Sequence, residues 1–133
     1  MKVGAHISIA GSINLAIERA KAIQCETFQI FTRNPRRWSC KEISDETAKK
    51  FKEKVVHSKI NPIIAHMPYL PNLASPDKEI WEKSVESLKL EIKRCEQLAI
   101  SYLVTHLGSP KTAGRDFGIS RVASALNLSL IHI

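Results

Sequence analysis

The sequence lacks the segments that would place it in or across a membrane. No apolar run approaches the roughly 20 residues that a membrane-spanning helix needs. The N-terminal stretch MKVGAHISIAGS carries one lysine, and no long apolar segment follows it, so a secretory signal peptide is not expected. We therefore expect a cytoplasmic protein that makes no membrane contact.

Cysteines are few, and several familiar catalytic motifs are missing. The three cysteines, Cys25, Cys40 and Cys95, form an odd set without CxxC spacing, which argues against a disulfide framework and against a cysteine zinc site. We expect reduced thiols that are buried or half-buried. The sequence contains no P-loop, no GxGxxG and no GxSxG motif. Nucleotide binding through a glycine-rich loop and serine-hydrolase chemistry are therefore not indicated.

The charge balance is strongly basic for a chain of ordinary composition. The 133 residues suffice for one domain, and the fractions of 44% hydrophobic and 25% charged residues are typical of globular proteins. The formal net charge is +7, which suits a polyanionic partner such as nucleic acid. A lysine-rich, solvated helix surface would give the same charge, because Lys49, Lys50, Lys52 and Lys54 share one expected helix.

Strand-like and helix-like segments alternate along the chain. Strands are expected at residues 2–7, 27–32, 61–66 and 101–106. Apolar residues recur at helical spacing over 13–23, 48–55 and 81–99, and a fourth helix is expected over 119–128. The candidate N-caps of the first three helices are Ser12, Ser44 and Ser75.

Four successive βα units of slightly more than 30 residues predict an α/β fold with a parallel sheet. The units are compatible with a doubly wound sheet or with a (β/α)8 TIM barrel. A complete barrel needs about 250 residues, so this chain would supply the first four βα units, about half of one.

Three histidines fall at or just past the ends of expected strands: His6, His66 and His106. The carboxyl ends of parallel strands share one edge, where active sites of α/β folds lie. The three imidazoles are therefore candidates for metal binding or acid–base chemistry, although hydrogen-bonded structural histidines would occupy the same places. His57, at an expected helix C-terminus, is interpreted as structural, and His132 is given no function.

Two stiff loops follow the second and third strands at the same edge. FTRNPRRW, residues 31–38, combines three arginines with a tryptophan around Pro35, which suits phosphate contact and stacking on a base or sugar. A solvated basic loop is the alternative. Tyr69 follows His66 and lies between two prolines, and it either packs through its hydroxyl or belongs to the same nucleic-acid surface.

Four motifs together resemble the endonuclease IV family, the zinc-dependent apurinic/apyrimidinic endonucleases of base excision repair. They are GAHISIAGSINLAIERA (4–20), FQIFTRNPRRW (28–38), HMPYLPNLASP (66–76) and RCEQLAISYLVTHLGS (94–109), in the family's order and spacing. The resemblance runs from Met1 to about Asn127.

The resemblance implies a (β/α)8 barrel with three zinc ions at its C-terminal rim. By position, His66 and His106 would be zinc ligands, and Arg36 and Tyr69 would enter the DNA minor groove at the abasic site. No catalytic residue is implied beyond the metal ligands. Three further residues match family positions near the site as possible rim or supporting groups: His6, Asn34 and Trp38.

The implied reaction is hydrolysis of the phosphodiester 5′ to an abasic site in double-stranded DNA. A metal-bound hydroxide would attack the phosphate, leaving a 3′-hydroxyl and a 5′-deoxyribose phosphate. The family draws its remaining zinc ligands from strands 5 to 8, which this sequence does not contain.

We therefore expect residues 1–128 to form the N-terminal half of an abasic-site endonuclease domain that is monomeric at full length. Residues 129–133 are expected to be a foreign tail or a product of truncation, and the chain is expected to be an inactive fragment. Two alternatives remain open: a metal-dependent sugar isomerase or epimerase barrel, and a non-catalytic nucleic-acid-binding fragment.

Overall fold

The computed structural model describes residues 1–130 as an alternation of four strands and four α-helices. The strands are β1 (Gly4–His6), β2 (Thr27–Phe31), β3 (Ile63–His66) and β4 (Tyr102–Val104). The helices are α1 (Leu15–Ala22), α2 (Asp45–Ser58), α3 (Lys78–Leu98) and α4 (Arg115–Leu130), with a short 3-10 helix, η1 (Lys111–Ala113), before α4.

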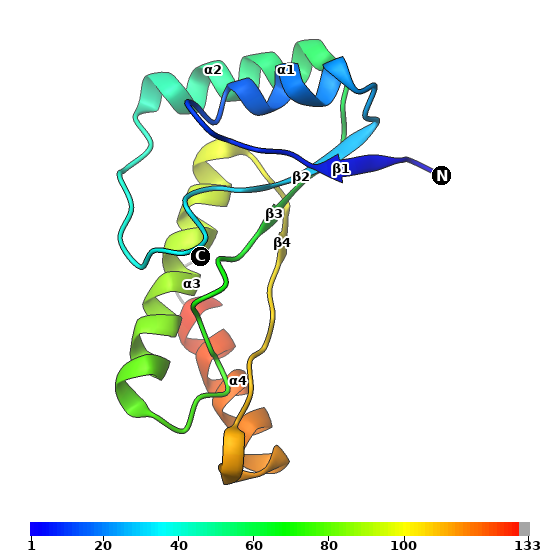
Figure 1. Ribbon diagram of the computed structural model, residues 1–133. Coiled ribbons are helices and arrows are strands. Elements are labelled where there is room, and N and C mark those ends of the chain that lie inside the picture. The colour runs from blue at the N-terminus through cyan, green and yellow to red at the C-terminus, as the bar shows by residue number, and fades with distance from the viewer. Residues whose placement is uncertain (131–133) are drawn as a thin grey trace.

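The four strands form one parallel sheet in sequential order, β1-β2-β3-β4. Figure 1 shows the helices on one side of the strands, with α1 beside α2 and α3 beside α4. Sequential order with one helical layer is the arrangement of a barrel and not of a doubly wound sheet, whose strand order reverses. The predicted fold class, four βα units of a TIM barrel, is confirmed.

The side chains of β2 show how the sheet separates its core from its rim. Phe28 and Ile30 are 1% and 0% exposed, and they pack with Ile17 of α1 and Phe51 of α2 in the larger core cluster. Because side chains alternate across a strand, Phe31 faces the opposite side of the sheet and is only half-buried. A second apolar cluster joins α3 to α4 through Leu88, Val122 and their neighbours.

Helix starts depart from two of the three predicted caps. Ser44 caps α2 as predicted, because its hydroxyl accepts from the Thr47 amide at 3.2 Å. The prediction for Ser75 was wrong: Asp77 caps α3 by accepting from the Ile80 amide at 2.9 Å, so the intervening Pro76 lies outside the helix. The prediction for Ser12 was also wrong, since the residue before α1 is Asn14, which makes no side-chain cap.

The ends of α3 and α4 also differ from the predictions. Ala99, predicted to continue the apolar stripe of α3, is exposed and ends the helix with a φ of 55°, while Leu98 and Ile100 are buried instead. The fourth helix is longer than residues 119–128 at both ends, because α4 begins at Arg115 and ends at Leu130. The other residues of the predicted tail, 131–133, and with them His132, lie outside the described residues.

No helix within residues 1–130 is both long enough and apolar enough to cross a membrane. His57 lies in the last turn of α2, where its Nδ1 is 2.7 Å from the Glu53 carbonyl oxygen.

The three cysteines are free thiols that differ in burial. Cys25 and Cys40 are half-buried and Cys95 is buried. Burial, together with the negative charge of Glu91, raises the pKa of the Cys95 thiol to about 12. Only the thiolate is a nucleophile, so Cys95 stays protonated and inert at neutral pH.

We expect alkylation of the folded chain by iodoacetamide at pH 8 to modify Cys25 and Cys40 and to spare Cys95. Peptide mass spectrometry after labelling checks the pattern, and labelling in urea provides the fully reactive control. Rapid modification of Cys95 in the folded chain would contradict the assigned burial.

Candidate metal- and DNA-binding rim

The carboxyl ends of the strands bring three histidines and two aromatic side chains to one rim. His6 ends β1, His66 ends β3, and His106 lies two residues beyond β4. The ring of Phe31, at the end of β2, has its centroid 4.5 Å from that of His6, 5.4 Å from His66 and 5.1 Å from Tyr69. The rim thus places Phe31 between the histidines as a shared packing partner that the sequence analysis did not single out.

His66 is held in an orientation that leaves one ring nitrogen available. The residue is 9% exposed, and its Nδ1 lies 2.7 Å from the Met67 carbonyl oxygen. A carbonyl only accepts, so Nδ1 carries the proton and Nε2 keeps its lone pair. A backbone acceptor on the far nitrogen is the usual support of a metal-binding histidine.

His106 is the nearest second imidazole. It is exposed, and its ring centroid lies 5.1 Å from that of His66, with the planes at 56°. Two imidazoles on one tetrahedral zinc have centroids about 5 Å apart when each Zn–N bond is about 2.0 to 2.1 Å. The separation therefore suits a shared ion.

His6 differs from the other two rim histidines. Its Nδ1 accepts a hydrogen bond from the Gln29 side-chain amide at 2.9 Å, which leaves the proton of the neutral ring on Nε2. Loss of water around the ring lowers the pKa of His6, and repulsion from His66 lowers it further. The residue as a whole is exposed, and its ring contacts that of Phe31. His6 is thus arranged as a neutral N–H donor.

The described residues do not contain a complete zinc site. Within residues 1–130, no three or more His, Cys, Asp or Glu side chains are arranged to hold a metal ion. Structural and catalytic zinc sites use three or four protein ligands. His66 and His106 supply two, so the donor set fits part of a metal centre.

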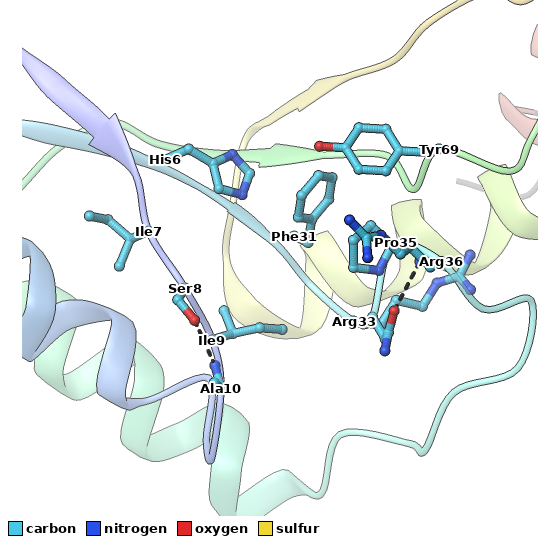
Figure 2. A pocket seen from close by; sticks show the side chains of 11 residues that line it. His6, Ile7, Ser8, Ile9, Ala10, Phe31, Arg33, Pro35, Arg36 and Tyr69 are labelled. Carbon is cyan, nitrogen blue, oxygen red and sulfur yellow. Dashed lines mark hydrogen bonds between the residues drawn. The ribbon is translucent and has the colours of Figure 1, made fainter.

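The loop after β2 presents Arg36 beside Tyr69. The Asn34 Oδ1 accepts from the Arg36 amide at 2.9 Å, and the Tyr69 amide donates to the Pro35 carbonyl at 3.1 Å, which ties the two rim loops together. Figure 2 shows the rings of His6, Phe31 and Tyr69 along the same open cavity as Arg36. The cavity has a volume of about 710 Å³, and both Arg36 and Tyr69 are exposed at it.

Two residues of this loop lie differently from the prediction. Arg33 was grouped with Arg36 and Arg37 as a phosphate contact, but it is only 4% exposed and is ion-paired with Glu91 of α3 at 2.5 Å. Trp38 is exposed but does not line the cavity. Residues 33–36 of the loop line the cavity, whereas Arg37 and Trp38 do not.

The buried partners of this loop were not predicted from the sequence. Ser87, Glu91 and Arg94 lie on one face of α3, and Arg33 contacts the first two of them. Their spacing of four and three residues places them on one side of a helix. This spacing could have predicted buried polar contacts, because polar side chains next to the apolar stripe of a helix need hydrogen-bonding partners when they are buried.

Asn72 links the loop after β3 to the loop after β4. Its Oδ1 accepts from the Ser109 amide at 3.0 Å, and its Nδ2 donates to the Ser109 carbonyl at 3.0 Å. The paired contact sets the position of the segment that contains His106. Gly108 lies against this contact with a φ of +90°, and an added Cβ would come within 2.0 Å of Asn72 Oδ1.

Comparison with known proteins first defines the class. Residues 17–132 match the family described as "Xylose isomerase-like TIM barrel". The chain belongs to this family. Solved barrels of low identity agree in fold alone, among them a D-psicose 3-epimerase with a TM-score of 0.66 and 13% identity over 94% of this chain and 46% of that one.

Closer relatives carry one name. The chain is 54% identical to "Probable endonuclease 4" of Methanosphaerula palustris over 96% of its length and 44% of that protein. It is 48% identical to the protein of the same name from Nitrosopumilus maritimus, over 95% of its length and 46% of that protein. The crystal structure of endonuclease IV from Thermus thermophilus superimposes with a TM-score of 0.87 at 34% identity, over 98% of this chain and 46% of that one. The resemblance to endonuclease IV is confirmed, and the chain spans slightly less than half the length of these relatives.

We expect Gly108→Ala to lower the free energy of unfolding by about 1 to 3 kcal/mol more than Gly114→Ala does, the range for a clash in a packed region. Gly114 has nearly the same φ, +91°, but nothing lies within 4 Å of an added Cβ. The pair therefore separates the clash with Asn72 from backbone strain. Urea unfolding of both variants measures the difference, and equal losses would show that the Asn72 contact does not constrain Gly108.

Proposed function

We propose that this chain supplies the N-terminal half of the active-site rim of an endonuclease that cuts DNA 5′ to abasic sites. The observation that carries the proposal is the placement of the His66 and His106 pair beside two exposed DNA-type contacts, Arg36 and Tyr69, on one rim. Relatives named endonuclease 4 support it. In this proposal residues 1–128 are that half, and residues 129 and 130 continue its last helix, α4.

Arg36 and Tyr69 are proposed to engage the DNA at the lesion. An arginine held on a rigid loop can enter a minor groove and pair with phosphates, and Asn34 fixes the backbone of that loop through the Arg36 amide. The exposed ring of Tyr69 offers a face for stacking where a base is missing. The net charge of +7 adds electrostatic attraction to the duplex. Trp38 does not line the cavity, so any contact that it makes with DNA lies outside the cavity.

His66 and His106 are proposed to be two ligands of a zinc centre, the resident metal that the family resemblance implies. Zinc supplies Lewis-acid stabilisation of a phosphodiester in such centres. The remaining ligands must come from groups that residues 1–130 do not contain, because the described set stops at two imidazoles. His6, neutral with its proton on Nε2, is suited to donate to a phosphate oxygen at the same rim.

The sugar isomerase or epimerase alternative has less support. The family description and the epimerase structure favour it at the level of the fold, but that structure shares only 13% identity with this chain. An exposed arginine and tyrosine on two rim loops match the phosphates and the open base stack of a damaged duplex, and a small sugar offers neither. A non-catalytic DNA-binding role keeps those contacts, and it is separated from the endonuclease by the incision experiment below.

The full-length protein is proposed to be a cytoplasmic monomer.

We expect Arg36→Ala and Tyr69→Ala each to weaken binding to a duplex with one abasic site by about tenfold, the loss of one charge-assisted or stacking contact. Fluorescence anisotropy with a labelled duplex at several salt concentrations measures this, and the slope of log K against log salt should fall by about one for Arg36→Ala alone.

Matched controls are available for both variants. Arg115 is exposed at the start of α4, and Tyr102 is 57% exposed on β4 against 60% for Tyr69. Alanine at either control position should leave the affinity unchanged. If Arg36→Ala and Arg115→Ala weaken DNA binding equally, the loss follows from the lower net charge alone. That result would contradict a specific binding site at Arg36.

We expect no incision by the 133-residue chain alone. Incision should be gained when residues 1–128 replace the matching segment of Thermus thermophilus endonuclease IV, which superimposes closely. In the chimera, His66→Ala or His106→Ala should lower the rate by at least about tenfold, the least that disturbing a metal ligand's surroundings costs, and a chelator should abolish it. His57→Ala, on the surface of α2, is the control. Chelator-sensitive incision by the 133-residue chain alone would contradict the assignment. Full activity of the chimera after replacement of His66 or His106 would contradict it as well.

A further inference from the structure

We propose that a buried charged cluster, made of Glu91, Arg33 and Arg94, positions the loop that presents Arg36 to DNA. The inference rests on the proposed function, because it names the residues that hold the proposed DNA contact in place. None of the three would touch DNA itself, so they are positioning residues. The loop runs from Thr32 to Lys41 and contains no helix or strand.

The first anchor holds the near end and the middle of the loop. Glu91 is 0% exposed, and its two carboxylate oxygens accept from Arg33 Nε at 2.5 Å and from the Thr32 hydroxyl at 2.6 Å. The Nη1 of Arg33 then donates to the backbone carbonyls of Arg37 and Trp38, at 2.8 and 2.9 Å. One buried guanidinium thus joins α3 to the two residues that follow Arg36.

The second anchor holds both ends of the loop to the next turn of α3. Arg94 is 6% exposed and donates through Nη2 to the Thr32 carbonyl at 2.6 Å and through Nε to the Thr32 hydroxyl at 2.9 Å. Its Nη1 donates to the Lys41 carbonyl at 3.0 Å. Both ends of the loop, Thr32 and Lys41, are therefore hydrogen-bonded to the Arg94 side chain, which keeps the two ends close together.

These contacts replace the backbone ladder that a strand or helix would provide. Among described residues 33–40, the backbone–backbone bonds are Arg37 to Asn34, at 3.4 Å, and Tyr69 to Pro35, at 3.1 Å. The loop's conformation therefore depends on the side-chain anchors. Because the Tyr69 amide bonds to Pro35 of this loop, the anchors also affect the position of Tyr69, the second proposed DNA contact.

The chemistry of the cluster favours a positioning role over a stabilising one. Removing ions from water is costly, and replacing a whole buried ion cluster by apolar side chains is often neutral for stability. Breaking the cluster at one member leaves an uncompensated buried charge instead. Two guanidinium groups with one carboxylate also leave a net positive charge beneath a loop proposed to meet phosphates, which favours anion approach.

The experiment removes the whole cluster and reads the loop directly. Trp38 and Trp81 are the only tryptophans, so Trp81→Phe leaves Trp38 as a single fluorescent reporter on the loop. In that background, Arg33→Met/Glu91→Leu/Arg94→Met should retain the helical circular dichroism of the parent. Acrylamide quenching of Trp38 should rise toward that of the urea-unfolded chain, and affinity for abasic duplex should fall about tenfold because the loop must be ordered on binding.

A second variant covers the case in which the triple replacement does not fold. Arg33→Lys keeps the charge beside Glu91 but lacks the planar fork that reaches both carbonyls. It should remain folded, and it should raise Trp38 quenching and weaken DNA binding in the same direction. Glu79→Gln is the control, because Glu79 lies on the same helix in an exposed pair with Lys83 at 2.6 Å, and it should change neither readout.

The outcomes separate this inference from the proposed function. If the parent binds abasic duplex, and the folded variants bind it equally well with unchanged acrylamide quenching of Trp38, the positioning role is overturned. If the parent does not bind abasic duplex, the proposed function fails and the DNA part of the inference fails with it. Trp38 quenching then still decides whether the cluster holds the loop.

Discussion

The carboxylate of Glu91 is the constraint on which the rim depends. A charge that is fully removed from water must be paired and hydrogen-bonded, and the partners of Glu91 are Thr32 and Arg33 at the end of β2. The hydrogen bonds that Glu91 requires hold the start of the loop after β2 against α3. The need for hydrogen bonds in the interior thereby fixes a surface loop that has almost no backbone bonds of its own.

Neighbouring rim loops are then connected in series. The loop after β2 meets the loop after β3 through Pro35 and Tyr69, and the loop after β3 meets the loop after β4 through Asn72 and Ser109. The parallel sheet supplies the common edge, since His66 lies opposite both Phe31 and Val104 in the strand register. Side chains far apart in sequence become one surface because sheet register and these links act together.

The sequence predicted the fold and the location of the site better than its local details. Periodicity located all four βα units, and strand ends located His6, His66 and His106, because both follow from regular backbone geometry. The buried role of Arg33 could not be predicted from its loop, since it depends on a residue 58 positions away. The cap prediction for Ser75 was wrong because Asp77, two residues later, has equal capping ability, and tertiary packing decides between the two. The prediction for Ser12 was wrong because α1 begins after Asn14 without any side-chain cap.

In the proposed function, the rim after β2, β3 and β4 is the surface that meets damaged DNA. Backbone amide shifts of the ¹⁵N-labelled chain, measured by NMR as abasic duplex is added, test it most directly. We expect the largest changes at residues 33–38, 66–72 and 105–109, with smaller changes for undamaged duplex. Changes confined to the lysine-rich surface of α2, or equal for the two duplexes, would contradict it.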